Sequence, residues 1–206
     1  MEYKSLDEYG SRLQIALRSI DQSYINFLIE EILKRINGDG EIFVIGNGGS
    51  AANGHHIAGD YSKTFSMMGK RIRISCLSDN ECFVTAAAND IGYEEIYEVL
   101  INTRVIKNDL IIFLSGSGNS INLIKAARKA KIVNIKTSAV LGYNGGALKS
   151  IVDIPLHAEI DDMEIAEDCQ LSIFHFIKQK IVNIISPTNK GESSKYNKRT
   201  KEDLIA

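Results

Sequence analysis

Two segments rich in glycine and serine carry the residue types that bind a phosphate group. The first, Gly46-Asn47-Gly48-Gly49-Ser50, follows the strand-like run 41–45, and the second, Ser115-Gly116-Ser117-Gly118-Asn119-Ser120, follows the apolar run 110–114. Glycines let backbone amides approach an anion, serines add hydroxyl donors, and the N-terminus of a following helix favours negative charge. Neither segment matches a nucleotide P-loop or a full GxGxxG fingerprint. The pattern favours a phosphate without a nucleotide; the alternative is two tight strand-to-helix turns with serine caps.

Histidine and acidic side chains form a second group of candidates. His56 and Asp60, which follow His55, are four residues apart and share one face of a predicted helix. Such a pair can bind a metal ion or simply form a hydrogen bond on the helix surface. Glu167 and His175 are eight residues apart on another predicted helix, about 12 Å along its axis. One compact site could hardly use both from one helix, so a joint role points to neighbouring subunits; the alternative is a charged helix start and a histidine at the core edge.

The elements that must position these residues follow from the apolar pattern. Strands are predicted over 41–45, 71–77, 110–114, 132–135 and 152–156, each separated from the next by helix-compatible sequence. Residues 6–36 predict one or two N-terminal helices, and residues 164–185 predict a long closing helix with a wide apolar face. This rhythm is typical of a parallel sheet, where ligands bind beyond the carboxyl ends of the strands. We expect one domain over residues 1–186 and a polar, flexible tail over 187–206.

The composition narrows the class of protein. The 206 residues include 24 Lys or Arg and 26 Asp or Glu, a formal net charge of −2, and 44% are hydrophobic. This suits one compact domain and argues against a disordered chain or a general nucleic-acid binder. The three cysteines lack metal-finger spacing and fit free thiols in a reducing compartment. With no signal core or bilayer-length apolar stretch, we expect a cytoplasmic protein without a membrane or nucleic-acid partner.

Several motifs together resemble those of the phosphoheptose isomerases, which are sugar isomerase (SIS) domain proteins. They are the segment Gly46 to Ala52, the following His56, the segment Ala88-Asn89-Asp90-Ile91-Gly92-Tyr93-Glu94, and the segment Ser115 to Ser120. The similarity runs in order from about residue 10 to residue 185. The resemblance implies an α/β fold, a flavodoxin-like three-layer α/β/α sandwich around a five-stranded parallel sheet with N-terminal helices. It also implies a homotetramer whose active sites lie between subunits.

The resemblance implies an isomerase that converts sedoheptulose 7-phosphate into an aldose heptose 7-phosphate, for the heptose of lipopolysaccharide or capsule. A base removes a proton from C1 of the ketose to give an enediol and returns it at C2, while a second group handles the oxygens. By resemblance the base is Asp60 and the acid is His175. The residues implied to bind the phosphorylated sugar are Asn47, Gly48, Gly49, Ser50, Asp90, Ser115, Gly116, Ser117, Ser120 and Glu167. The positions implied to hold one zinc per subunit are His56, Asp60, Glu167 and His175.

Among the positions that depart from the family pattern, two carry an acid. The usual base is glutamate, whereas Asp60 is one methylene shorter, and a displacement of about 1 Å can cost roughly 100-fold in rate. The usual glutamine of the closing helix is Glu167, which adds a negative charge. One hypothesis is a co-varied site in which two acids and two histidines surround a divalent cation. The alternatives are an SIS isomerase for another sugar phosphate, or a non-catalytic SIS binding protein associated with the replication initiator.

Overall fold

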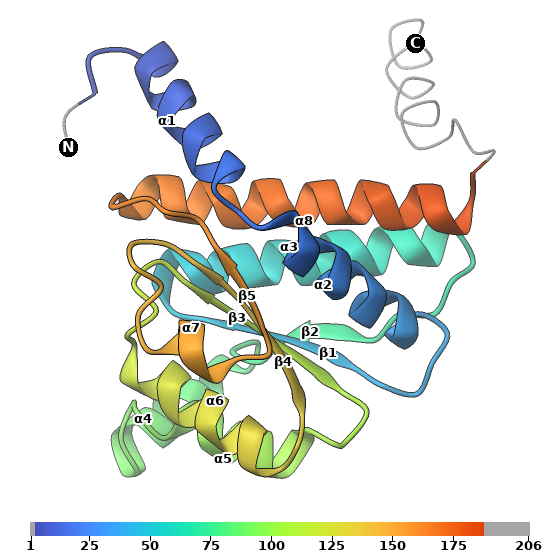
Figure 1. Ribbon diagram of the computed structural model, residues 1–206. Helices are drawn as coiled ribbons and strands as arrows, with labels where there is room; N and C mark the ends of the chain where they lie inside the picture. Colours follow the sequence, from blue (N-terminus) through green and yellow to red (C-terminus); the bar gives the residue numbers. More distant parts are fainter. Residues whose placement is uncertain (1–2, 188–206) are drawn as a thin grey trace, which may run out of the picture.

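The computed structural model describes residues 3–187 (Figure 1). In chain order, its elements are α1 (Leu6–Arg18), α2 (Gln22–Arg35), β1 (Ile42–Gly46), α3 (Gly48–Met67), β2 (Ile74–Cys76), α4 (Glu81–Asp90), α5 (Ile96–Arg104), β3 (Leu110–Ser115), α6 (Ile121–Ile132), β4 (Lys136–Leu141), α7 (Leu148–Ile151), β5 (Ile154–His157) and α8 (Met163–Ile185). The segment 6–36 therefore forms two helices. The predicted tail, except for Pro187, lies outside the described residues.

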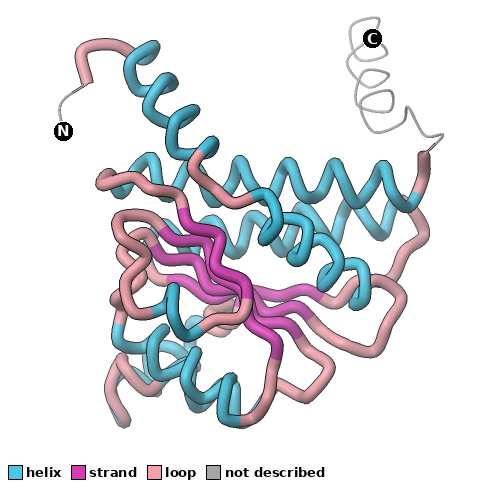
Figure 2. Tube along the Cα trace, viewed as in Figure 1, coloured by secondary structure: helices cyan, strands magenta, loops and turns pink. Residues whose placement is uncertain are grey.

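The five strands form one parallel sheet in the order β2-β1-β3-β4-β5. Figure 2 shows this sheet between two layers of helices, which confirms the predicted flavodoxin-like fold class. The chain adds β2 on one side of β1 and then reverses direction to add β3 on the other. In such sheets the ligand crevice lies beyond the carboxyl ends of the strands at the reversal point. The loops after β1 and β3 are therefore the ones placed to form a site.

β1 and most of β3 are apolar and fully buried because helices cover both faces of the sheet. In β1, Ile42 and Val44 pack into a core formed with α1, α2, α3 and α8. The intervening Phe43 and Ile45 pack into a second core, formed with α5, α6 and α7. Both cores include residues of β1 and β3, the strands that end at the glycine- and serine-rich loops. The packed strands therefore hold the starts of these loops in place.

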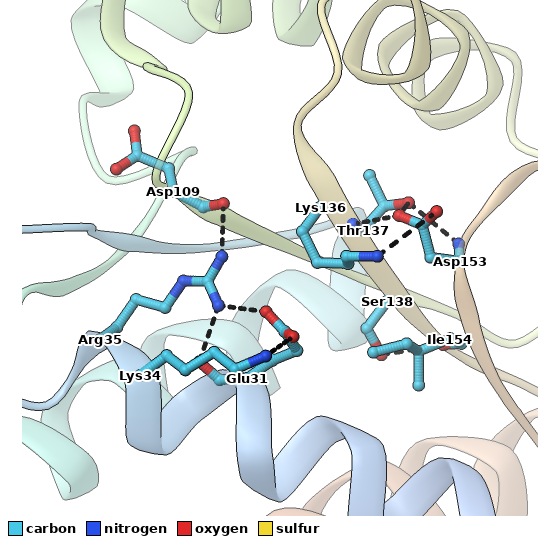
Figure 3. A network of polar contacts seen from close by, with 9 residues as sticks. All are labelled: Glu31, Lys34, Arg35, Asp109, Lys136, Thr137, Ser138, Asp153 and Ile154. Atoms are coloured by element: carbon cyan, nitrogen blue, oxygen red, sulfur yellow. Dashed lines mark hydrogen bonds and ion pairs between the residues drawn. The ribbon is translucent and has the colours of Figure 1, made fainter.

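The strand predicted over 132–135 is wrong, because α6 continues to Ile132 and β4 begins only at Lys136. Asn134 ends the helix with a left-handed φ of 55°. The start of β4 is polar, which hides it from an apolar pattern. Figure 3 shows how these polar groups are satisfied: the Thr137 amide and hydroxyl donate to Asp153 at 2.8 and 3.0 Å, and the Ser138 hydroxyl donates to a backbone carbonyl of β5 at 2.9 Å.

Arg35 fastens α2 to the amino ends of the strands. Its guanidinium donates to the backbone carbonyl of Asp109 at 3.1 Å and pairs with the Glu31 carboxylate (Figure 3). The Asp109 carboxylate in turn accepts the backbone amide of Glu41 at 2.7 Å. These contacts tie the starts of β1 and β3 together, at the end of the sheet away from the candidate site. Across residues 3–187, no helix combines the length and apolar character that crossing a bilayer requires.

Candidate functional site

The loop after β1 contains two consecutive glycines, one in a left-handed conformation and one packed closely against α8. Gly48 has a φ of +51°, a conformation that residues with a side chain rarely adopt. At Gly49, a Cβ atom would overlap the carboxylate of Glu167 on α8. Asn47 caps α3 from the extended region. The first turn of α3 therefore lies against Glu167 of α8, at the reversal point of the sheet.

The loops after β1 and β3 enclose a hollow of about 230 Å³ with residues from α6 and α8. Its lining residues are Asn47, Gly48, Gly49, Ser50, Leu114, Ser115, Gly116, Ser117, Ser120, Leu123, Met163 and Glu167. Four serines and two helix N-termini thus face one space, which suits a phosphate group. The predicted convergence of the two segments is confirmed.

Two of the serine hydroxyls are held by bonds in which their oxygen accepts. Ser50 accepts from the Gln170 amide at 3.0 Å, and the carbonyl of that amide accepts from Asn53 at 2.9 Å. Ser115 accepts from the backbone amide of Gly118 at 3.0 Å. A hydroxyl that accepts a bond still has its own proton to donate. Ser50 and Ser115 are therefore fixed in orientation with one donor available for an anion.

Asn47 belongs to a cluster of polar side chains at the entrance of the hollow. Its amide exchanges two hydrogen bonds with the amide of Asn122, each 2.9 Å long. The hydroxyl of Tyr93, a half-exposed residue, donates to the same Asn47 oxygen at 2.8 Å. The side chain of Asn47 is therefore fixed from two elements, α6 and the loop before α5.

A second cluster lies between α3 and α8, which run side by side over one face of the sheet (Figure 1). His56 and Asp60 of α3 and His175 of α8 offer ligand atoms that all lie within 4.8 Å of one another. The Nε2 atoms of His56 and His175 are 3.1 Å apart. Two imidazoles and a carboxylate are ligands that suit zinc. We refer to these three residues as the triad.

Charges around the triad decide the protonation of its members. Burial alone raises the pKa of Asp60, but the ammonium of Lys178, which donates to it at 2.6 Å, and that of Lys63 hold its pKa below the usual range. Burial lowers the pKa of His175, and the neighbouring His56 and Lys178 lower it further, against the attraction of Asp60. At neutral pH the triad therefore holds an ionised carboxylate beside a neutral His175 imidazole.

The structure separates the remaining predicted site residues. Glu167 lines the hollow, two turns of α8 away from His175, and is not among the residues that form the triad. Asp90 is the last residue of α4, exposed, and accepts from the amide of Asn89 at 2.8 Å. Within residues 3–187, Asp90 is not one of the residues that line the hollow. His55 contacts Ser78 at 3.5 Å, outside the triad.

Three polar residues of the site were not found from the sequence. Gln170 and Asn53 join α8 to α3 behind Ser50, and Lys178 pairs with Asp60. Gln170 carries no signal in a single sequence, because its partners are more than a hundred positions away. Lys178 does carry one, since it lies three residues after His175 and therefore on the same face of the helix.

Comparisons with known proteins give a consistent result. A family model described as SIS domain matches residues 8–142. A phosphoheptose isomerase of Helicobacter pylori (strain Shi470) is 32% identical over 165 residues, which cover 80% of this chain and 85% of that protein. A probable phosphoheptose isomerase of Thermoplasma volcanium is 29% identical, over 86% of this chain and 91% of that protein. The phosphoheptose isomerase structure from Neisseria gonorrhoeae shares the fold, with a TM-score of 0.76 and 22% identity over 85% of this chain and 95% of that one.

Proposed function

Since this chain belongs to the SIS-domain family, within the phosphoheptose isomerases, we propose that it converts sedoheptulose 7-phosphate into an aldose heptose 7-phosphate. The observation that carries this proposal is the pairing of a serine-lined hollow with a carboxylate–histidine triad. Both sites use residues of α3 and α8. The first suits a phosphate, and the second supplies the two proton handlers that an aldose–ketose isomerisation requires. We further propose that residues 1–186 act as a single domain in the cytoplasm and serve heptose synthesis for lipopolysaccharide or capsule.

The hollow binds the phosphate group in this proposal. Ser50, Ser115, Ser117 and Ser120 donate hydroxyl protons, and the backbone amides of Gly48, Gly49 and Gly116 lie at the loops that face it. Asn47 and Asp90 contact the sugar. Asn47 is suited to this role because Asn122 and Tyr93 fix its side chain before the substrate arrives.

The triad carries out the proton transfers. Asp60 removes the proton from C1 of the ketose, since its carboxylate is ionised at neutral pH. His175 is neutral, so its ring can accept a proton from one substrate oxygen and deliver one to the other. The proton returned at C2 completes the aldose.

We propose that zinc binds at the triad, one ion per subunit. The donor set fits, because two imidazole nitrogens and a carboxylate oxygen lie within 4.8 Å of one another. Glu167 lines the hollow and lies two turns of α8 away from His175, so in this proposal the fourth ligand is Glu167 of another copy of the chain. A bound zinc ion would polarise the substrate carbonyl.

Helix geometry supports a site shared between copies of the chain. Ser50 and Asp60 are ten residues apart on α3, about 15 Å along the axis, and Glu167 and His175 are about 12 Å apart on α8. Both distances are long for one seven-carbon substrate or one metal ion. We therefore propose a homotetramer in which the triad of one copy completes the hollow of another. A partly apolar groove between α2 and α8, which includes Ile29, Leu33, Phe176 and Ile184, supports packing against a second copy.

The decisive experiment follows sedoheptulose 7-phosphate by NMR with wild-type protein and with Asp60→Ala, each with and without added zinc. We expect an aldose heptose 7-phosphate from the wild type and no turnover from the variant. Absence of turnover under every metal condition would contradict the proposal and would direct the search to other sugar phosphates, then to a binding role with the replication initiator.

A complementation experiment tests the shared site. Asp60→Ala and the double variant Ser115→Ala/Ser117→Ala are each expected to be inactive. Mixed tetramers that carry both variants regain part of the activity if one copy supplies the triad and another supplies the hollow. No recovery in verified mixed tetramers would place the whole site in one copy.

A further inference from the structure

We propose that Lys178 is a built-in competitor for the metal at the triad. Its ammonium holds the Asp60 carboxylate in the metal-free protein and must leave before a divalent cation binds there. This inference deepens the proposed function, because it concerns the same site and rests on the triad as the metal-binding group.

The contact between Lys178 and Asp60 is short and protected. The Nζ atom lies 2.6 Å from Oδ2, and each side chain is only 14% exposed. Lys63 also approaches Asp60, but at 3.6 Å and with a side chain that is 63% exposed. Solvent screens an exposed pair of this kind, so Lys63 acts on the carboxylate less than Lys178 does. Lys178 is therefore the cation that occupies Asp60.

In the metal-free protein, each side chain of the triad already has a hydrogen-bond partner. The Nε2 atoms of His56 and His175 share one hydrogen bond at 3.1 Å, and Asp60 accepts from Lys178. A metal ion that uses all three residues must replace both interactions. The histidines lose only the hydrogen bond between their two rings, whereas the carboxylate would carry an ammonium and a divalent cation side by side. Two cations a few ångströms apart in a half-buried site repel each other strongly, because water screens them poorly.

Lysine is suited to a reversible role of this kind. Its ammonium is a point charge on a flexible stem of four carbons, so it can move from the carboxylate to solvent without displacing α8. The competition therefore lowers metal affinity without closing the site. It also keeps Asp60 ionised and directed at the two histidines when the metal is absent, which makes Lys178 a positioning residue.

The test compares the zinc affinity of four metal-stripped full-length proteins: the wild type, Lys178→Met, Lys178→Arg and Lys180→Met. Methionine keeps an unbranched stem of similar length without the charge, and arginine keeps the charge. Lys180 is the matched control, because it lies on the same helix but is exposed and rests over the ring of Phe176, 5.3 Å from the ring centroid. Zinc affinity is measured by competition with a chromophoric chelator, and cobalt absorption reports the ligand set.

We expect Lys178→Met to bind zinc at least about 10-fold more tightly than the wild type, with Lys178→Arg and Lys180→Met within about 3-fold of it. Tighter binding only by Lys178→Met supports the proposal. Equal affinity of Lys178→Met and wild type, an equal gain in Lys180→Met, or no zinc binding by any of the four would overturn it. Lys178→Gln repeats the test if the methionine variant does not fold. Since turnover is not part of the readout, failure here leaves the isomerase proposal intact, and an inactive protein can still show the competition.

Discussion

The side-chain amide of Gln170 donates to the hydroxyl oxygen of Ser50 across 3.0 Å, and both side chains are almost completely buried. The other end of the Gln170 amide accepts from Asn53. These two hydrogen bonds, which we call the Gln170 relay, join α8 to the first two turns of α3. The relay fixes the Ser50 hydroxyl at the hollow, although Gln170 itself does not line that space.

Replacing Gln170 with methionine removes this relay while keeping the volume of the side chain similar. We expect KM for the phosphorylated sugar to rise about 10-fold and kcat to change less, because the lost bond positions a ligand of the phosphate and not a reacting group. Steady-state kinetics with Gln179→Met, an exposed position on the same helix, provide the control. An unchanged KM in Gln170→Met would show that Ser50 needs no support.

Asp60→Glu tests whether the shorter acid is matched to this site. The variant carries the residue usual in the family, but its carboxylate would move by about 1 Å from its present position 2.6 Å from the Lys178 ammonium. We expect kcat to fall by roughly 100-fold, since geometry limits proton transfer at this distance. The rate of product formation by NMR measures the effect. A rate equal to or above the wild type would show that Asp60 is not tuned to its neighbours.

Glu167 places a carboxylate in the hollow that we assign to phosphate. Glu167→Gln removes the negative charge and keeps the shape, so we expect inorganic phosphate to bind about 10-fold more tightly at low salt. High salt reduces the gain, because it screens the repulsion. Calorimetric titration with phosphate gives both affinities, and Glu164→Gln, exposed in the first turn of α8, is the matched control. Equal affinities for Glu167→Gln and wild type would mean that the carboxylate points away from the bound anion.

Asp162 is the N-cap residue of α8, and its carboxylate makes the stability of the protein depend on pH. Its carboxylate accepts from the Ile165 backbone amide at 3.0 Å and from the Tyr3 hydroxyl at 2.6 Å. Burial raises the pKa of Asp162, but these bonds outweigh it and hold the pKa below its ordinary 3.8. Because the folded pKa is depressed, the stabilisation is complete above 3.8 and is lost as the pH falls through the folded value.

We expect Asp162→Ala to lower the free energy of unfolding by about 1 kcal/mol at neutral pH, the usual cost of losing a helix cap. The difference between wild type and variant shrinks as the pH falls below 3.8 and through the depressed folded pKa of Asp162, because both proteins then lack the charged cap. Urea unfolding at neutral pH and at a pH below the folded pKa measures it, and Asp161→Ala, a neighbouring exposed acid, is the control. A difference that does not depend on pH would assign the effect to packing.

Much of the fold was predictable because its signals are local. Five apolar runs with helix-compatible sequence between them predicted a parallel sheet, and four of the five strands are found close to their predicted positions. The fourth was misplaced because β4 begins with three polar residues, Lys136 and the buried Thr137 and Ser138. Their hydroxyls are satisfied by Asp153 and by the backbone of β5, which only the folded chain brings near.

The candidate site, like the fold, was predictable from the sequence only in part. The sequence by itself determined that two glycine- and serine-rich loops end apolar strands, that His56 and Asp60 share a helix face, and that Glu167 and His175 do not reach one point, because helix and strand periodicity fix these relations. Only the tertiary structure decided that His175 joins the triad while Glu167 lines the hollow, and that Lys178 pairs with an acid 118 positions away. Such pairs depend on how α3 and α8 pack against each other over the sheet, which is set by the whole core and not by neighbours along the chain.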